Sequence, residues 1–289
     1  MTATAILAVA KNWPTPNTKN TAHAECGLSR RRSAFGVDYT NRLRYLILSD
    51  IHANVDALDT VLKAAPAGTW DRLLVLGDLV GYGAEPNAVI ERILSLAPLA
   101  TIRGNHDKAA CWIENAAEFN HIARAAALWT FEALTPEHRM YLQRLPAGPL
   151  SIDDQVEICH GTPFDEDHYI FGLDDATQAL DAAARPVCFF GHTHLPVVYQ
   201  RTAEMDLPLV PVSDGTVEVA LKSDGRYLIN PGSVGQPRDG DPRAGYATYD
   251  TESRTLTLLR IEYPVDEAQR RILDAGLPLS LAQRLAIGR

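Results

Sequence analysis

Short apolar segments alternate with helical patterns from residue 45 onward. Apolar runs at 45–48 and 73–76 predict buried strands, and a third short strand is predicted at 99–103. Between them, apolar side chains recur at helical spacing over 54–65 and from Pro86 onward, and Asn54 is suited to cap the first of these helices. Each predicted strand ends at a polar, mostly glycine-containing segment, and ligands bind at such strand ends in open α/β sheets.

The second half of the chain is richer in strands. Helices are predicted at 123–134, 136–145 and 176–184. Strand patterns fall at 156–159, 187–190, 195–199, 226–229, 246–249 and 256–261, and residues 265–285 read as one or two short helices interrupted at Gly276-Leu277-Pro278. Alternating strands and helices followed by a run of strands predict an α/β fold with mixed sheets.

The first 42 residues show no sustained periodicity, and residues 11–40 are rich in Asn, Thr, Ser and Pro. We interpret residues 1–42 as a disordered extension and residues 43–289 as one domain, with terminal helices in 263–289 packed on it. A targeting signal is the alternative for the apolar residues 1–10. However, Arg30, Arg31 and Arg32 follow that stretch, whereas the basic residues of a secretory signal precede it.

The charge and cysteine content narrow the classes of partner. A net charge of −9 disfavours nucleic acid, because proteins that coat nucleic acids carry a surplus of Lys and Arg. No apolar run approaches the roughly 20 residues that span a bilayer, so no membrane association is expected. The 4 cysteines lie apart and form no Cys-x-x-Cys pair. This usage fits a protein of the reducing cytoplasm better than a disulfide framework.

Five short polar motifs each follow an apolar run. They are Asp50-x-His52, Gly77-Asp78-x-x-Gly81, Gly104-Asn105-His106-Asp107, His160-Gly161 and Gly191-His192-Thr193-His194. Each motif alone is weak, because an Asp or Asn at a strand end is often only a turn former. Together they offer seven potential metal ligands at predicted strand ends: Asp50, His52, Asp78, Asn105, His160, His192 and His194. This oxygen and imidazole set, without thiolates, suits manganese, iron or zinc.

The five motifs resemble those of the metallophosphoesterase (calcineurin-like) superfamily, D-x-H, G-D-x-x-G, G-N-H-[DE], H and G-H-x-H. The likeness extends over residues 43–250. A narrower resemblance to a bacterial branch related to diadenosine tetraphosphatases and Ser/Thr phosphatases is carried by residues 49–54, 77–87, 104–108 and 230–238. The resemblance implies a four-layer α-β-β-α sandwich with two mixed β-sheets.

The resemblance also implies a role for each motif residue. Asp50, His52 and His194 would bind one divalent metal ion, Asn105, His160 and His192 would bind a second, and Asp78 would bridge the two. A metal-bridging hydroxide would attack the phosphorus, and His106 would act on the leaving oxygen. Asp107 would orient His106 and favour its protonated form, although a helix-capping role is the alternative for this carboxylate.

The expected activity is hydrolysis of a phosphate ester or anhydride of a small molecule, such as a nucleotide or a dinucleoside polyphosphate. Arg238 and Arg243 are candidates to bind a second phosphate, unless they pair with the aspartates of their own loop, and Tyr82 and Asn87 are candidates to line the pocket. A protein Ser/Thr phosphatase, a phosphodiesterase or nuclease, and a non-catalytic scaffold are the alternatives. The complete ligand set disfavours a scaffold, and the absence of a basic stripe in the sequence disfavours a nuclease.

Overall fold

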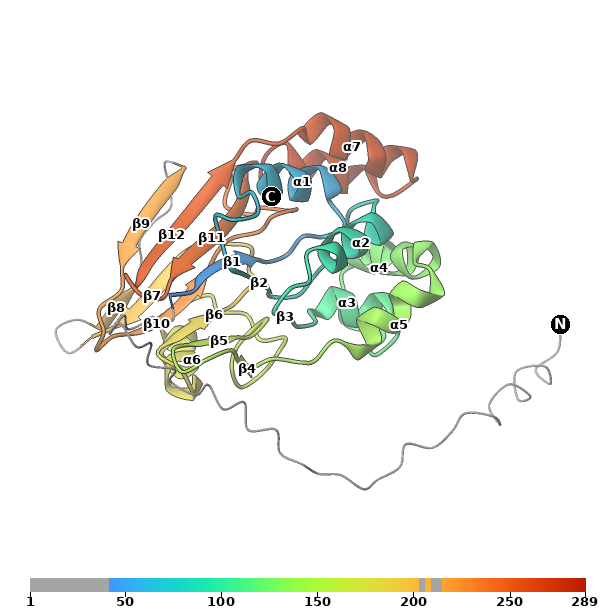
Figure 1. The fold of residues 1–289 in the computed structure, drawn as a ribbon. Helices are drawn as coiled ribbons and strands as arrows, with labels where there is room; N and C mark the ends of the chain where they lie inside the picture. Colours follow the sequence, from blue (N-terminus) through green and yellow to red (C-terminus); the bar gives the residue numbers. More distant parts are fainter. Residues whose placement is uncertain (1–41, 203–205, 209–214) are drawn as a thin grey trace, which may run out of the picture. The chain divides into compact units, whose positions relative to one another are not determined.

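The computed structural model describes residues 42–202, 206–208 and 215–289, which form two six-stranded sheets (Figure 1). The first sheet contains β1 (Arg44–Leu48), β2 (Arg72–Val75), β3 (Ala100–Thr101), β9 (Thr216–Ala220), β11 (Ala244–Asp250) and β12 (Thr255–Ile261), in the order β3-β2-β1-β11-β12-β9. The second contains β4 (Leu150–Ser151), β5 (Val156–Ile158), β6 (Val187–Phe189), β7 (Val197–Arg201), β8 (Asp206–Pro208) and β10 (Arg226–Asn230), in the order β4-β5-β6-β10-β7-β8. Both sheets are mixed, since β1 pairs in parallel with β2 and antiparallel with β11, and β10 pairs in parallel with β6 and antiparallel with β7.

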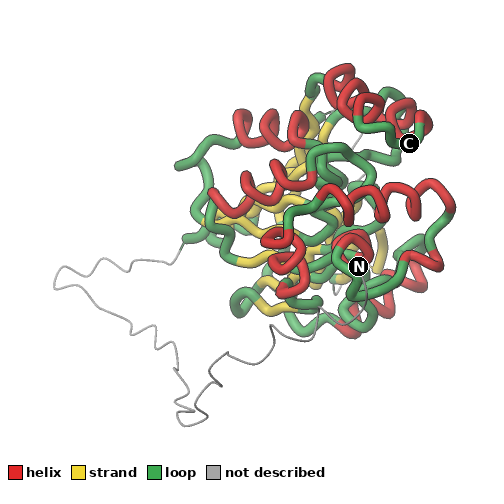
Figure 2. Tube along the Cα trace, turned by 90° about the vertical axis from the view of Figure 1, so that its right-hand side faces the viewer, coloured by secondary structure: helices red, strands yellow, loops and turns green. Residues whose placement is uncertain are grey.

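Eight α-helices accompany the sheets in the described residues. They are α1 (Val55–Ala64), α2 (Pro86–Ser95), α3 (Asn105–Ala110), α4 (His121–Ala133), α5 (Pro136–Arg144), α6 (Leu173–Ala182), α7 (Val265–Asp274) and α8 (Leu279–Leu285). All except α6 contribute to one apolar cluster with the first sheet, whereas α6 packs against the second sheet. Figure 2 shows the helices in front of the strands when the domain is viewed from the helical side.

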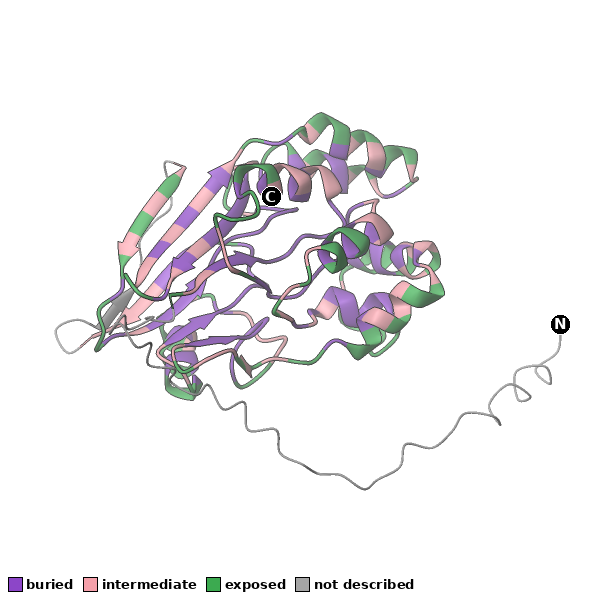
Figure 3. Cartoon of the chain, viewed as in Figure 1, coloured by how far each residue is buried: buried purple, intermediate pink, exposed green. Residues whose placement is uncertain are grey.

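Strand β1 shows how the sequence builds these layers. Leu46 and Leu48 point to the cluster under the helices, while Tyr45 and Ile47 point to the cluster between the two sheets. Because successive side chains of a strand face opposite sides, a run that is apolar at every position belongs in a sheet covered on both faces. The central strands, such as β1, are accordingly drawn as buried along almost their whole length (Figure 3). The order helix, sheet, sheet, helix confirms the predicted four-layer α/β fold.

Several short elements were not predicted from the sequence. Helix α3 occupies residues that we expected in a loop after a strand, and β4, β8 and β9 were not expected. Six residues are too few to show helical periodicity, and α3 begins instead at a cap provided by Asp107. Strand β9 lies at an edge and alternates exposed with half-buried side chains, so it lacks the apolar run of a central strand (Figure 3).

The buried cysteines agree with expectation. Cys159 and Cys188 are fully buried free thiols in the cluster beneath α6, as predicted for small core residues. Helices α7 and α8 pack into the apolar cluster between the first sheet and its helices through buried residues that include Ile272, Leu281 and Leu285. Across the described stretches of chain, no helix is long and apolar enough to cross a membrane.

The proposed extension of residues 1–42 falls almost wholly outside the described residues, and its disorder stays a prediction. A chain beginning near Asn41 should fold and melt within a few degrees of the full-length protein, because every strand of the two sheets begins at Arg44 or later. Thermal denaturation of both proteins, followed by circular dichroism, measures the difference. A large drop in melting temperature, or failure of the shorter chain to fold, would show that the extension packs on the domain.

Candidate active site

The predicted metal ligands gather where strands of both sheets end. Asp50 and Asp78 follow β1 and β2 of the first sheet, and His160 and His192 follow β5 and β6 of the second. Five of the ligands adopt the left-handed backbone conformation, with φ of 52° at Asp50, 49° at His52, 52° at Asp78, 65° at His192 and 61° at His194. Non-glycine residues seldom adopt positive φ, and such strain concentrates at functional sites because the surrounding fold must enforce it.

Glycines permit the close approach of these turns. At Gly104, a Cβ atom would lie 2.1 Å from Oδ1 of Asp78, and at Gly191 it would lie 2.1 Å from the hydroxyl of Ser49. Neither position has room for a larger residue. This accounts for the glycines that precede Asn105 and His192 in the motifs.

Four side chains form the first ligand cluster, Asp50, His52, Asp78 and His194, and all four are buried. Nε2 of His194 lies 3.3 Å from Oδ1 of Asp50, and Nε2 of His52 lies 3.6 Å from Oδ2 of Asp78. The two imidazole Nε2 atoms are 3.1 Å apart. Carboxylate oxygens and imidazole nitrogens that converge in this way form the donor set of a transition-metal site.

Asp78, His160 and His192 form the second cluster, and the candidate ligand atoms in each cluster lie within 4.8 Å of one another. Asp78 therefore belongs to both clusters, and its Oδ2 lies 3.5 Å from Nε2 of His160. Among the described residues, no hydrogen-bond partner satisfies the buried Oδ1 of Asn105 or the buried Nε2 of His160. Buried polar atoms are rarely left unpaired, so these two orphans fit a site completed by a cation.

Each imidazole is held by a backbone carbonyl at its other nitrogen. The contacts are His52 Nδ1 to Val80 O (3.1 Å), His160 Nδ1 to Leu76 O (2.8 Å), His192 Nε2 to Asp167 O (2.9 Å) and His194 Nδ1 to Gln236 O (2.5 Å). A ring nitrogen that is hydrogen-bonded to a carbonyl must carry a proton. In a neutral imidazole, the opposite nitrogen then has the lone pair. His52, His192 and His194 therefore present a lone pair to the clusters, whereas His160, whose pKa is raised by Asp78 and Asp50, would release its second proton when a cation binds.

The protonation equilibria fit this arrangement. Burial lowers the pKa of His52, His192 and His194 well below the usual range, so these rings are neutral, as metal ligands must be. Burial opposes charge on both Asp78 and His160, but the attraction within this buried pair outweighs it, so the pKa of Asp78 falls well below its usual range and the pKa of His160 rises to about 10. Burial also raises the pKa of Asp50 to about 6. The centre of the site thus holds an ionised carboxylate within reach of both clusters.

His106 lies beside the clusters at the wall of an open cavity. Its backbone N–H donates to Oδ1 of Asp78 (2.8 Å), and its ring lies 4.2 Å from that of Tyr82 and 4.7 Å from that of Phe119. Nδ1 of His106 is buried and has no hydrogen-bond partner in the described part of the chain. The pKa of His106 is lowered to about 4, chiefly by burial, with Arg238 and His160 adding positive charge nearby. The ring is therefore neutral near pH 7.

The expected contact between Asp107 and His106 is corrected by the structure. Oδ2 of Asp107 accepts from the Gly104 N–H (3.0 Å), and Oδ1 accepts from the Val80 N–H (3.2 Å). One oxygen thus caps the start of α3, and the other holds the loop after β2. This is the helix-capping role that the sequence analysis considered for Asp107. Asp107 positions the segment that carries Asn105 and His106 through the backbone rather than through the His106 ring.

Two of the four predicted substrate-binding residues are at the site. Tyr82 packs against His52 and His106, with ring centroids 4.8 and 4.2 Å away. The guanidinium of Arg238 lies over the Tyr82 ring, 5.7 Å from its centroid, and donates to Oε1 of Gln236 (3.2 Å).

The other two have structural positions, and their predicted role was wrong. Nδ2 of Asn87 donates to the Ala133 carbonyl (2.8 Å), and its Oδ1 accepts from the Thr135 N–H (3.0 Å), so Asn87 links α2 to the α4–α5 junction. Arg243 binds Asp241 in a forked ion pair of 2.6 Å and lines a separate cavity with Tyr263. The pairing that we considered for the loop arginines therefore holds for Arg243 but not for Arg238.

Sequence analysis missed the residues that support the second cluster. Lys108 is 1% exposed, and its Nζ contacts Glu114 (2.9 Å), Glu166 (3.2 Å) and Asp167 (2.5 Å). The carbonyl of Asp167 is the group that orients His192. Lys108 immediately follows the Gly-Asn-His-Asp motif, but only the fold shows that three distant or exposed carboxylates surround it.

Lys108→Met should lower metal affinity at the cluster of Asp78, His160 and His192. Without the ammonium, the loop that carries Glu166 and Asp167 is no longer held in place. Loss of a group that orients a metal ligand lowers metal affinity by roughly 10–100-fold. Titration of Mn²⁺ by calorimetry measures the effect, with Lys63→Met at the exposed end of α1 as the matched control. Unchanged affinity in Lys108→Met would contradict the positioning role.

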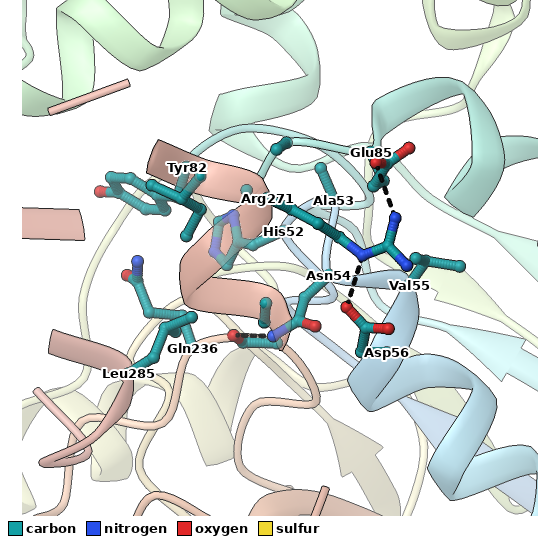
Figure 4. Close-up of a pocket in the computed structure, with 15 residues that line it drawn as sticks. His52, Ala53, Asn54, Val55, Asp56, Tyr82, Glu85, Gln236, Arg271 and Leu285 are labelled. Carbon is teal, nitrogen blue, oxygen red and sulfur yellow. Dashed lines mark hydrogen bonds and ion pairs between the residues drawn. The ribbon is translucent and has the colours of Figure 1, made fainter. Parts of the chain in front are cut away.

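The cavity beside His106 is the largest space next to the clusters. It has a volume of about 660 Å³ and is lined by residues that include Asn105, His106, Phe119, Tyr169 and His192. A second cavity behind His52, bordered by Asn54 and Arg271, measures about 10 Å³ (Figure 4). That volume holds a single water molecule at most, so ligand binding falls to the first cavity.

Comparisons with known proteins agree with the geometry. The calcineurin-like phosphoesterase superfamily domain matches residues 43–254. The crystal structure of a metallophosphoesterase from Sphaerobacter thermophilus has 40% sequence identity and a TM-score of 0.76, and covers 86% of this chain and 100% of that chain. An uncharacterized protein of Methanocaldococcus jannaschii is 34% identical over 252 residues, 84% of this chain and 97% of its own length. Phosphodiesterase YfcE of Escherichia coli is 25% identical over 226 residues, 75% of this chain and 92% of its own.

These matches identify the class of protein. The chain belongs to the calcineurin-like phosphoesterase superfamily, and it is a metal-dependent phosphoester hydrolase. The sequence-based recognition of the family is thereby confirmed.

Proposed function

We propose that this protein hydrolyses a phosphate ester or anhydride of a small molecule, using two divalent metal ions. One observation carries the proposal: the buried carboxylate of Asp78 is shared by two separate ligand clusters. Asp50, His52 and His194 would complete one metal site, and Asn105, His160 and His192 the other. The donor set suits manganese, iron or zinc.

The bound cations supply a nucleophile from water at neutral pH and neutralise charge on the phosphate oxygens. The protein's own groups prepare for this chemistry. Ser49 donates to Oδ2 of Asp50 (2.6 Å), and the backbone N–H of His192 donates to the same carboxylate (3.3 Å to Oδ1 and 3.2 Å to Oδ2), so the Asp50 side chain is held in one orientation. These contacts fix the ligands before a substrate arrives, which lowers the reorganisation required during catalysis.

His106 is assigned to the leaving oxygen, because it lines the cavity and is not needed in either cluster. Its low pKa makes it a neutral N–H donor at pH 7 rather than the cation expected from the sequence. A neutral donor can still stabilise the negative charge that develops on the leaving oxygen, as donors of an oxyanion hole do.

The cavity supports a small-molecule substrate. Its volume of about 660 Å³ lies within the range of roughly 300–1,000 Å³ typical of small-molecule sites. Glu114 and Glu118 also line it, and these carboxylates together with the net charge of −9 oppose the backbone of a nucleic acid. A protein Ser/Thr phosphatase is the second candidate, since the same clusters serve a phosphorylated side chain.

A turnover screen of the purified protein loaded with Mn²⁺ tests the proposal. It should compare p-nitrophenyl phosphate, bis(p-nitrophenyl) phosphate, dinucleoside polyphosphates and a phosphoserine peptide. Bis(p-nitrophenyl) phosphate is included because the relative YfcE is a phosphodiesterase. We expect metal-dependent turnover of at least one small-molecule ester or anhydride. Turnover of the peptide alone would favour the protein phosphatase, and no turnover with any metal would overturn the assignment.

A further inference from the structure

Two arginine side chains converge on Tyr82 at the edge of the active site. The guanidinium carbons of Arg238 and Arg284 each lie 5.7 Å from the centre of the Tyr82 ring. Arg238 comes from the loop after β10 and also reaches the Tyr82 hydroxyl (3.4 Å). Arg284 comes from α8, more than forty residues later in the chain. One tyrosine therefore brings together two cations from distant segments.

Neither of these two guanidiniums has an Asp or Glu partner among the described residues. Within the described ranges, no ion pair includes either Arg238 or Arg284, although the sequence holds 36 acidic residues against 27 basic ones. Even in the same loop, Arg243 pairs with Asp241. Nε of Arg238 is buried and has no hydrogen-bond partner in the described part of the chain. Burial and the charge of Arg238 lower the pKa of Arg284.

Two like charges that share no Asp or Glu partner repel each other, and a cation–π contact with one shared ring only partly offsets their repulsion. The arrangement becomes favourable when an anion lies between the guanidiniums, because their planar forks match the geometry of a phosphate or carboxylate. The arrangement of the two guanidiniums therefore points to an anion-binding site.

The location of the pair relates it to the reaction. Arg238 and Arg284 both contact the ring of Tyr82, which lines the same cavity as His106. The Tyr82 ring between them packs on His106 at 4.2 Å. An anion held between the two arginines would therefore lie at the Tyr82 edge of the cavity that His106 lines.

We propose that Arg238 and Arg284 form a second anion subsite, which binds a phosphate or carboxylate carried by the leaving group of the substrate. This inference rests on the proposed function and narrows the substrate to molecules with an anionic group close to the cleaved bond. Arg284 would then be a specificity residue that lies outside the matched superfamily domain of residues 43–254.

The terminal helices hold Arg284 in place. Leu281 and Leu285 of α8 are buried, and Arg271 of α7 pairs with Asp56 of α1 (2.9 Å) and with Glu85 (3.1 Å; Figure 4). Nε of Arg284 donates to a main-chain oxygen of Arg289, the last residue of the sequence (2.6 Å). The side chain is therefore presented from a packed helix rather than from a free chain end.

Competitive inhibition of bis(p-nitrophenyl) phosphate hydrolysis tests the subsite with matched ligands. Phosphoglycolate is compared with methyl phosphate, and ADP with AMP, so that each pair differs by one carboxylate or one phosphate. Mn²⁺ is kept in excess of all ligands. The wild type should bind the ligand with two anionic groups roughly tenfold or more tightly in at least one pair, and the pair that discriminates identifies the anion. Arg284→Gln should reduce that ratio to near one.

Three variants separate this role from a structural one. Arg284→Lys keeps the charge and should retain part of the discrimination. Arg270→Gln changes an exposed arginine of α7 and should leave the ratio and the turnover of the reporter unchanged. Arg238→Gln combined with Arg284→Gln should lose little more discrimination than either alone, because both arginines act on one anion. Melting temperatures confirm that each variant is folded.

Equal binding of both members in each wild-type pair would overturn the subsite. So would an Arg284→Gln variant that weakens ligands with one and two anionic groups by the same factor. A wild type that fails to hydrolyse the reporter contradicts the proposed function separately, and in that case calorimetric titration of the same four ligands still decides whether the two arginines bind an anion.

Discussion

Asp78→Asn is expected to lower turnover by more than about 1,000-fold and to reduce the metal content of the protein. The carboxylate belongs to both ligand clusters, so an amide in its place removes a negative charge from each. Metal ions provide several kcal/mol of stabilisation in such reactions, and each factor of ten in rate corresponds to about 1.4 kcal/mol. No other side chain in the described residues belongs to both clusters, which is why this change should have the largest effect.

Elemental analysis and turnover of a chromogenic ester measure the two effects together. Asp71→Asn is the matched control, because Asp71 forms a partly exposed ion pair with Arg44 (3.1 Å) just before β2. Exposed pairs contribute about 0–1 kcal/mol, so this control should keep its metals and its activity. Loss of an acceptor for the His106 N–H is not expected in Asp78→Asn, since an amide oxygen can still accept. Full activity with a full complement of metal in Asp78→Asn would refute the bridging role.

His106→Ala should separate catalysis from metal binding. The side chain is outside both ligand clusters and lines the cavity, so the variant should retain its metal ions. We expect kcat to fall by roughly 10²–10⁴-fold with little change in KM, because the interaction forms mainly in the transition state. The loss should be smaller for a nitrophenyl ester, whose leaving group is already stable as an anion, than for an alkyl ester.

Metal analysis together with kcat for a good and a poor leaving group decides the matter. His121→Ala, which alters an exposed imidazole at the start of α4, should behave like the wild type. If His106 were instead a ligand, His106→Ala would lose metal and both classes of substrate would decline together. That result would show that His106 is a metal ligand and not a group that acts on the leaving oxygen.

The fold and the residues of the two candidate ligand clusters were largely predictable from local sequence. Runs such as 45–48 and 73–76 are short and apolar at every position, as is typical of strands in a sheet covered on both faces. Asp50 and Asp78 stand directly after these strands, and parallel strands bring such positions to one edge. Both features depend on short-range order along the chain, and they can therefore be recognised without the tertiary structure.

The roles of the surrounding residues were decided by contacts between segments far apart in sequence. Asp107 and His106 are neighbours in the chain, yet α3 turns the carboxylate toward Gly104 and Val80 and leaves the imidazole at the cavity. Arg238 and Arg243 lie in one loop, but Arg243 pairs with Asp241 while Arg238 reaches Tyr82. Chemically equivalent residues cannot be distinguished until their partners are known.

The sequence by itself thus determined which residues could bind metal and which strands would carry them, because residue type and periodicity are properties of the chain. Only the tertiary structure placed Lys108 among three carboxylates and brought Arg284 to Tyr82 across more than 200 residues. Charge pairing and burial depend on three-dimensional distance, and the sequence carries no direct signal of distance between segments that meet only when the chain folds.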